Sequence, residues 1–168
     1  MPAQATLTAG IVGLLTGVVD IGDVAHSLSY NPSVTLTDGT GANQINRIYA
    51  DTITLAASAT QDIDLAGTLV DAIGQTVTFA RVKGILIRTA SANTNNVIVG
   101  GASSNGFITW VGGATHTVTV RPGGFLAIAA PDATAYAVTA GTGDLLRVAN
   151  SSSGSSVTFD LVIVGATA

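Results

Sequence analysis

The stretch VTFDLVI at residues 157–163 decides the class of fold. Successive side chains of a β-strand point to opposite faces, and alternation of apolar and polar residues therefore marks a half-buried strand. One face of this stretch carries only large apolar side chains: Val157, Phe159, Leu161 and Ile163. The other face begins with Thr158 and Asp160 and turns apolar at Val162 and Val164. The pattern predicts a strand with one face in a core and a far end covered on both faces.

Similar segments, rich in Val, Ile and Thr and bounded by Gly, Asn, Asp and Ser, fill most of the chain. The expected strands, besides 157–163, are 45–56, 62–66, 76–89, 96–100, 107–111, 115–120, 125–129, 136–139 and 145–149. Short turns between many short strands are typical of an antiparallel β-sandwich or jelly roll, and we predict this all-β class. A single helical turn is expected at Thr68 to Ile73, ended by Gly74.

The long segment 76–89 contains a conflict between charge and burial. Arg81 and Lys83 fall on the same face as Val77 and Phe79, and a buried face does not easily accept charged side chains. We therefore expect a β-bulge or a crossover in this segment, with Gly84 as its site.

The first forty residues differ in texture from the rest. The segment Ala5 to Val19 is apolar and interrupted by glycines, and two turn signals follow it, Asn31-Pro32 and Asp38-Gly39. We divide the chain into an N-terminal arm or outer strands at 1–41 and a β-sandwich domain at 42–168. The alternative is that the first residues are simply the first strands of the same sandwich.

The apolar run Ile11 to Val19 is not expected to be a targeting or membrane segment. No basic residue precedes it, and it is shorter than the ~20 residues that a membrane-spanning helix needs. The sequence predicts a soluble, unprocessed chain with an adhesive N-terminal segment.

Charged residues make up only 10% of the chain, against roughly 25% in ordinary soluble domains. Glutamate and cysteine are absent, and the mean hydropathy is +0.53. So few charges cannot keep a large free surface solvated, and the composition favours a building block of an assembly. The net charge of −4 and the dispersed basic residues argue against binding of nucleic acid.

The residues that carry chemistry are few. Asp62 and Asp64 share a strand face and could mimic a carboxylate pair, but such neighbours are ordinarily just solvated. His26 and His116 are too few for a histidine-rich metal site, and a calcium site at Asp71 or Asp38 lacks the required spacing. We expect no enzyme activity, no catalytic, cofactor or metal site, and a local bridge between Asp144 and Arg147.

Four runs of sequence resemble a family of small virion proteins of tailed double-stranded DNA phages. They are RIYADTITL at 47–55, VTFARVK at 77–83, VTVRPGG at 118–124 and TGDLLRVAN at 142–150. The chain resembles the head decoration, or cement, proteins of such phages, and the likeness covers roughly residues 42–168. The resemblance implies a jelly-roll subunit on the capsid surface, a homotrimer, and the major capsid protein as partner, with no nucleic acid and no membrane.

The resemblance transfers no functional residue, because these runs are structural. The candidate assembly interface comes from the exposed apolar residues expected in the arm and from the single tryptophan: Ile11, Val12, Leu14, Leu15, Val18, Val19 and Trp110. Two alternatives stay open. One is a phage tail or baseplate component, and the other is a receptor-binding or carbohydrate-binding module that would use Trp110, Tyr30, Tyr49 and Tyr136.

Overall fold

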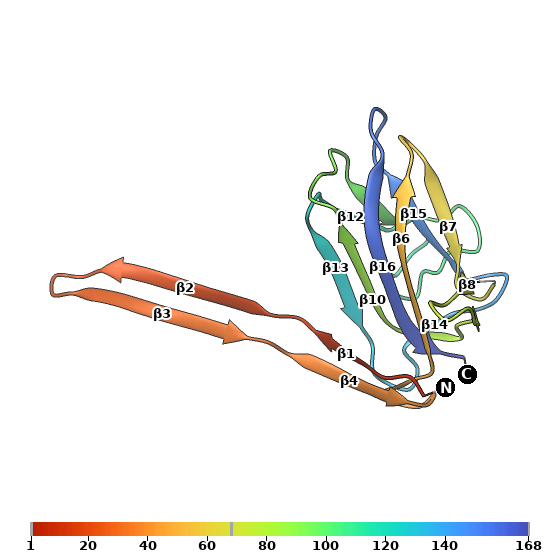
Figure 1. Ribbon diagram of the computed structural model, residues 1–168, viewed down its shortest axis with the longest axis horizontal. Helices are drawn as coiled ribbons and strands as arrows, with labels where there is room; N and C mark the ends of the chain where they lie inside the picture. Colours follow the sequence, from red (N-terminus) through yellow and green to blue (C-terminus); the bar gives the residue numbers. More distant parts are fainter. Residues whose placement is uncertain (1, 68, 168) are drawn as a thin grey trace.

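A computed structural model describes residues 2–67 and 69–167 and shows an all-β protein, with no helix among these residues. Two sheets pack face to face, and a long two-stranded arm projects from one end of them (Figure 1). The first sheet contains β6 (Arg47–Leu55), β10 (Arg81–Thr89), β13 (Phe125–Ala129), β14 (Tyr136–Ala137) and β16 (Val157–Ala166). The second contains β7 (Thr60–Asp64), β11 (Val97–Gly100), β12 (Thr117–Val120) and β15 (Leu145–Asn150).

The order of the strands is that of a jelly roll. The first sheet runs β13-β10-β16-β6, with β14 also paired to β10, and the second runs β12-β11-β15-β7. When the eight main strands are numbered in chain order, the sheets read 6-3-8-1 and 5-4-7-2. This double-sheet arrangement confirms the predicted antiparallel β-sandwich of jelly-roll type.

The main core lies between the two sheets. From β16 it takes the four side chains that the alternation placed inward, Val157, Phe159, Leu161 and Ile163, each at most 1% exposed. The facing sheet contributes Val97, Val99, Leu146 and Val148, which are fully buried. The inward-facing apolar side chains of both sheets thus form one continuous core layer.

The far end of β16 is covered on its second face as well, as its sequence predicted. Val164 is buried in a separate small core with Leu36 and Ile45, against which Val162 also packs. This second core joins the sandwich to a three-stranded sheet of β1 (Ala5–Thr8), β4 (Ser33–Asp38) and β5 (Gln44–Ile45). The pairing of β4 with β5 is parallel, whereas all other strand pairs of the described residues are antiparallel.

The charge conflict in β10 is resolved by a β-bulge. The pairing with β16 shifts between Val82 and Gly84, so that Lys83 is the extra residue. Lys83 is fully buried, and its Nζ donates hydrogen bonds to the backbone oxygens of Gly41, at 3.0 Å, and of Asp132. Burial lowers the pKa of Lys83, partly opposed by the nearby Asp132 carboxylate. The bulge therefore directs the ammonium group to two carbonyl acceptors.

Two predicted elements are wrong. Residues 107–111 contain no strand, and residues 109–111 form a turn in which Val111 N donates to Ile108 O at 3.0 Å. In the segment predicted as a helical turn, Thr68 lies outside the described residues. The rest forms a small hairpin of β8 (Leu69–Val70) and β9 (Thr76–Val77). The Asp71 carboxylate closes this hairpin by accepting hydrogen bonds from Ile73 N and Gln75 N, and Gly74 adopts a φ of +80°.

The arm consists of β2 (Ile11–Val18) and β3 (Asp23–Tyr30), which pair over their whole length. The pairing of β1 with β4 has the same register, because each pair of residue numbers in both hairpins adds up to 41. The four strands therefore form one ribbon without a bulge. Its base lies on the sandwich, and its distal half projects away from it (Figure 1).

Candidate assembly interface

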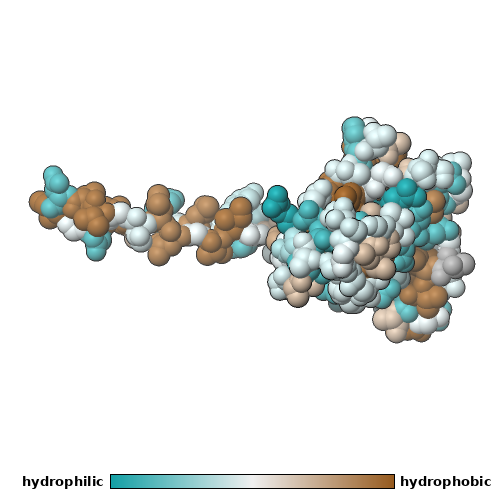
Figure 2. All heavy atoms as spheres, turned by 90° about the horizontal axis from the view of Figure 1, so that it is seen from above, coloured by the Kyte–Doolittle hydropathy of each residue, from teal (hydrophilic) through white to brown (hydrophobic). Residues whose placement is uncertain are grey.

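The distal arm exposes apolar side chains along its whole length. Every residue of β2 and β3 is exposed, and Figure 2 shows groups of hydrophobic residues recurring along the arm to its tip, with more polar residues between them. The six predicted interface residues of this segment, Ile11, Val12, Leu14, Leu15, Val18 and Val19, are all at least half exposed. The sequence located them correctly on an outer hairpin. Ile21, Val24, Leu28 and Tyr30 join them in the structure.

The two faces of the arm differ in composition. The register places Ile11, Gly13, Leu15 and Gly17 of β2 on one face with Val24, His26, Leu28 and Tyr30 of β3, and we call it the apolar face. The other, which we call the mixed face, has Val12, Leu14, Thr16 and Val18 on β2 but Asp23, Ala25, Ser27 and Ser29 on β3. Large apolar side chains from both strands meet only on the apolar face.

The apolar face continues a face that is already buried at the base of the arm. Because the register is constant, it extends the row of Ala5 and Leu7 on β1 and of Val34 and Leu36 on β4. These four residues belong to the second core, on the outer surface of the first sheet. Leu7 lies so close to Gly84 that a Cβ placed there would be 2.4 Å from Leu7 Cδ2. The base of the ribbon is thus shaped to fit the sheet.

Charge on the arm is confined to its tip. Between Ala9 and Asn31 the charged residues are Asp20 and Asp23, and the segment contains no lysine or arginine. Attraction to phosphate-rich surfaces requires clustered basic residues, which are missing here. The arm therefore presents a surface with two acidic residues at its tip and no basic side chain.

An isolated hairpin with this surface is not expected to be stable in water. Two strands without a third strand or a packed face are marginally stable, and soluble monomers rarely expose a continuous apolar patch beyond a few hundred Å². Its free edges also present backbone groups that can pair with another chain. The arm is thus an exposed apolar surface with unpaired strand edges.

Trp110, the seventh predicted interface residue, belongs to another part of the molecule. It is partly buried against the main core, and its Nε1 donates to Phe107 O at 3.0 Å. Nothing joins it to the arm residues, none of which contacts that core. Tyr49 and Tyr136 also pack in the main core, whereas Tyr30 lies on the arm, so the four aromatic residues do not converge on one surface.

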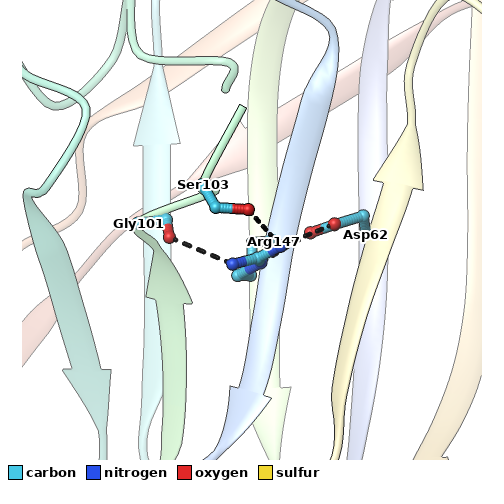
Figure 3. Close-up of polar contacts among 4 residues, drawn as sticks. All are labelled: Asp62, Gly101, Ser103 and Arg147. Carbon is cyan, nitrogen blue, oxygen red and sulfur yellow. Dashed lines mark hydrogen bonds and ion pairs between the residues drawn. The ribbon is translucent and has the colours of Figure 1, made fainter. Parts of the chain in front are cut away.

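The acidic pair of β7 is engaged in structural contacts. Asp62 binds the Arg147 guanidinium, and Arg147 also reaches Gly101 O at 3.5 Å and Ser103 Oγ at 3.3 Å (Figure 3). The hydrogen bonds from Arg147 lower the pKa of Asp62 despite partial burial, and they raise that of Arg147. Asp64 Oδ1 accepts a hydrogen bond from Ala66 N at 3.1 Å. A carboxylate held ionised by a bidentate arginine is poorly suited to acid–base chemistry.

The expected bridge between Asp144 and Arg147 is wrong. Arg147 pairs with Asp62, and the buried Asp144 accepts a hydrogen bond from Gly141 N instead. Sequence proximity favoured Asp144, but the pairing of β15 with β7 places Arg147 directly opposite Asp62. Asp62 lies 85 positions from Arg147 in the sequence, and only the pairing of strands brings the two together.

The remaining polar candidates are likewise dispersed. His116 Nδ1 lies 2.9 Å from Val111 O, and His26 lies on the arm. Asp38 accepts a hydrogen bond from Ala3 N at 2.9 Å, and Asp71 closes its own turn. Within residues 2–67 and 69–167, no group of three histidine or acidic side chains is placed to hold a metal ion.

A hollow of about 590 Å³ lies beside β6, between the first residues of the chain and the β8–β9 hairpin. Arg47 and Asp71 are its charged lining residues, and Ile48, Ala50, Ala72 and Ile73 supply apolar surface. The lining contains no histidine and no serine to form a nucleophile with its base.

Comparison of the chain with protein-family models, with curated proteins and with solved structures finds no match. Over the residues that the structure covers, no helix has the length and apolarity to cross a membrane.

Proposed function

We propose that this protein is a structural virion protein, a decoration or cement protein that binds the head of a tailed phage and stabilises it by bridging neighbouring capsomers. The observation that carries the proposal is the arm: an apolar, fully exposed hairpin on a jelly-roll body. Exposed apolar surface of this extent is typical of proteins whose surface is covered by other protein chains in an assembly.

Three further features support this role. The chain has few charges, and an assembled protein needs apolar and hydrogen-bonding surface more than charge. The polar clusters described above are occupied by contacts of the fold itself. The four runs of sequence that resemble phage decoration proteins lie in the jelly-roll body, and a homotrimer on the capsid surface is the assembly that this resemblance implies.

The energetic logic of a cement protein is simple. Ligands that bind only the assembled shell stabilise it by mass action, and a contact repeated at every copy adds up over the whole head. A small rigid body with a long arm can contact two neighbouring subunits at once. The body and the arm would then supply separate contacts.

The test is binding of the purified protein to phage heads that lack their decoration protein. We expect co-sedimentation that saturates at a fixed number of copies per head, and a higher melting temperature of the decorated heads. Failure to bind heads, together with binding to isolated tails or to a glycan array, would overturn the proposal in favour of a tail component or a glycan-binding module.

A variant without the distal arm provides the matched control. Ala9 N donates to Pro32 O, so by alternation Leu7 and Val34 are the next hydrogen-bonded pair, and an Asn-Gly turn can replace residues 8–33 and close the β1–β4 hairpin. The second core stays intact in this variant. If the arm takes part in assembly, the variant should bind heads at least tenfold more weakly while unfolding at the same temperature as the complete chain.

A further inference from the structure

The outer surface of the first sheet, opposite the main core, is only partly covered. Cross-strand neighbours form three rows on this surface, each containing one residue of β13, β10, β16 and β6 in that order. The rows are Ala129, Gly84, Val164 and Ile48; Ala127, Leu86, Val162 and Ala50; and Phe125, Arg88, Asp160 and Thr52. The first two rows contain no polar side chain.

The base of the arm covers the first row except Ala129, which is exposed, and only part of the second row. Leu7 lies over Gly84, and Val164, Ile48 and Val162 pack in the second core. Beyond that cover, Leu86 is 41% and Phe125 67% exposed, and Ala127 is exposed too. We call Leu86, Phe125, Ala127 and the exposed Arg88 the open patch. A phenylalanine that is two-thirds exposed on a flat sheet is the kind of anchor that interfaces use.

The molecule therefore leaves two apolar surfaces uncovered, and they are related. The apolar face of the distal arm continues the row of side chains that covers the first sheet of its own subunit. The distal arm projects away from that sheet, beyond the β13 edge (Figure 1). A second copy of the chain has the same outer surface of the first sheet, including its open patch. We infer that the apolar face of the arm of one copy lies across the open patch of a second copy.

The dimensions are compatible with this docking. An eight-residue strand is about 26 Å long, and four strands spaced by about 4.8 Å span less than 20 Å, so the arm can cross the whole sheet. The five large apolar side chains on the apolar face, Ile11, Leu15, Val24, Leu28 and Tyr30, are 48% to 72% exposed, which amounts to on the order of 600 Å² per copy. Covering them would bury about 1,200 Å² in total, the lower end of specific interfaces.

Charge complementarity favours the same partner. The tip of the arm carries Asp20 and Asp23, whereas the open patch includes Arg88 and the exposed Arg121 lies beside it. Arg121 lies next to β10, because Thr89 Oγ1 donates to Arg121 O at 2.6 Å. Asp160, the cross-strand neighbour of Arg88, accepts a hydrogen bond from Thr52 at 2.8 Å. Two acidic residues on one partner and two arginines on the other provide attraction and set the register of docking.

This inference deepens the proposed function, on which it rests for its biological purpose, by naming the partner of the arm. Its test uses no phage heads, so the two can fail separately. A monomer that still coats heads would contradict only the docking of the arm. A stable oligomer that ignores heads would contradict only the decoration role.

The first experiment measures the mass of the complete chain in solution by light scattering across a range of concentrations. Leu14 and Leu15 form a matched pair, because they are adjacent on β2, 69% and 72% exposed, and on opposite faces. We expect Leu15→Asp to weaken association at least tenfold and Leu14→Asp to change it less than threefold. Equal effects of the two variants would overturn the inference.

The second experiment tests the acceptor surface by charge reversal. We expect Asp20→Lys with Asp23→Lys to weaken association, as should Arg88→Asp with Arg121→Asp, and the four changes together should restore much of it. Phe125→Ser should weaken association at least tenfold. Unfolding temperatures measured at concentrations where every variant is monomeric show whether the fold is intact.

Three further results would overturn the inference. The first is a monomeric wild-type protein at all concentrations. The second is an oligomer that depends on Leu15 but not on Phe125, which would mean that arms pair with each other. The third is the absence of any recovery in the fourfold charge variant although both double variants dissociate.

Discussion

Arg147 on β15 lies directly opposite Asp62 on β7 and donates two hydrogen bonds to its carboxylate, from Nε to Oδ1 at 2.7 Å and from Nη2 to Oδ2 at 2.8 Å. This bidentate pair joins an edge strand to the centre of the second sheet. It is partly accessible, with the Arg147 and Asp62 side chains 23% and 33% exposed. Its contribution to stability is therefore expected to be about 1 kcal/mol at most.

Asp62→Asn should remove a pH-dependent part of the stability. The pKa of Asp62 is lowered from its ordinary value of 3.8, so the unfolded chain takes up the proton first as the pH falls. The stabilisation is present above pH 3.8 and is lost as the pH falls through the lower pKa of the folded state. Urea unfolding at pH 7 and at pH 2 to 3 should show a loss of up to about 1 kcal/mol at pH 7 and a smaller one in acid.

The double-mutant cycle with Arg147→Met is the control. If the pair causes the effect, Asp62→Asn should have no pH-dependent consequence once Arg147 is gone. A loss that stays the same in the absence of Arg147 would show that Asp62 acts through another contact.

Lys83→Met should destabilise the fold although it removes a buried charge. The backbone oxygens of Gly41 and Asp132 both accept hydrogen bonds from Lys83 Nζ, and methionine leaves them without this donor. Buried acceptors that lose a partner cost about 1 to 3 kcal/mol. Chemical denaturation measures the change. A variant as stable as the wild type would mean that the desolvation of the ammonium already cancels its hydrogen bonds.

The sequence predicted those features that follow from a single strand. Alternation in residues 157–163 predicted which face of β16 is buried and that its end near Val164 is covered on both faces. The position of Lys83 on the same face as Val77 and Phe79 predicted the bulge. Pairings between distant strands leave no such pattern, which is why Arg147 was assigned to Asp144 instead of Asp62. Residues 107–111 have the composition of a strand, yet Trp110 bonds back to Phe107 and the segment turns.

The exposure of the arm could be expected only in part. The apolar segment 11–19 has the composition of a core strand as much as that of an interface strand, since burial in the subunit and burial in an assembly select the same residues. The texture of the first forty residues suggested an outer hairpin. The open patch could not be foreseen, because it is defined by where the base of the arm stops on a sheet assembled from four separate segments.

Gly84→Val should displace the base of the arm while leaving the sandwich folded. A Cβ at Gly84 would lie 2.4 Å from Leu7 Cδ2 and 3.1 Å from Val164 Cγ2. Strand β1 therefore cannot keep its present distance from β10. Gly84 has no positive φ, and valine itself favours a strand. Hydrogen exchange should therefore become faster in β1 and β4 and stay slow in β11 and β15.

Two variants check the cause of that effect. Leu7→Ala in the Gly84→Val background should restore slow exchange in β1 and β4 by making room. Gly13→Val adds the same side chain on the distal arm, where nothing lies within 4 Å of the added Cβ. It should leave exchange in β1 and β4 unchanged.

Tyr49→Phe should abolish a loss of stability at high pH. Burial, with help from the neighbouring Asp51 carboxylate, raises the pKa of Tyr49 to about 12, and its hydroxyl donates to Asp51 Oδ2 at 3.1 Å. The unfolded chain loses the proton near the ordinary value of 10.0, whereas the folded chain keeps it. The stabilisation is thus complete below pH 10 and is lost progressively as the pH rises towards about 12. Denaturation at pH 8 and at pH 11 should show a smaller drop in the phenylalanine variant. An unchanged drop would mean that other groups cause the alkaline instability and that Tyr49 ionises equally easily in both states.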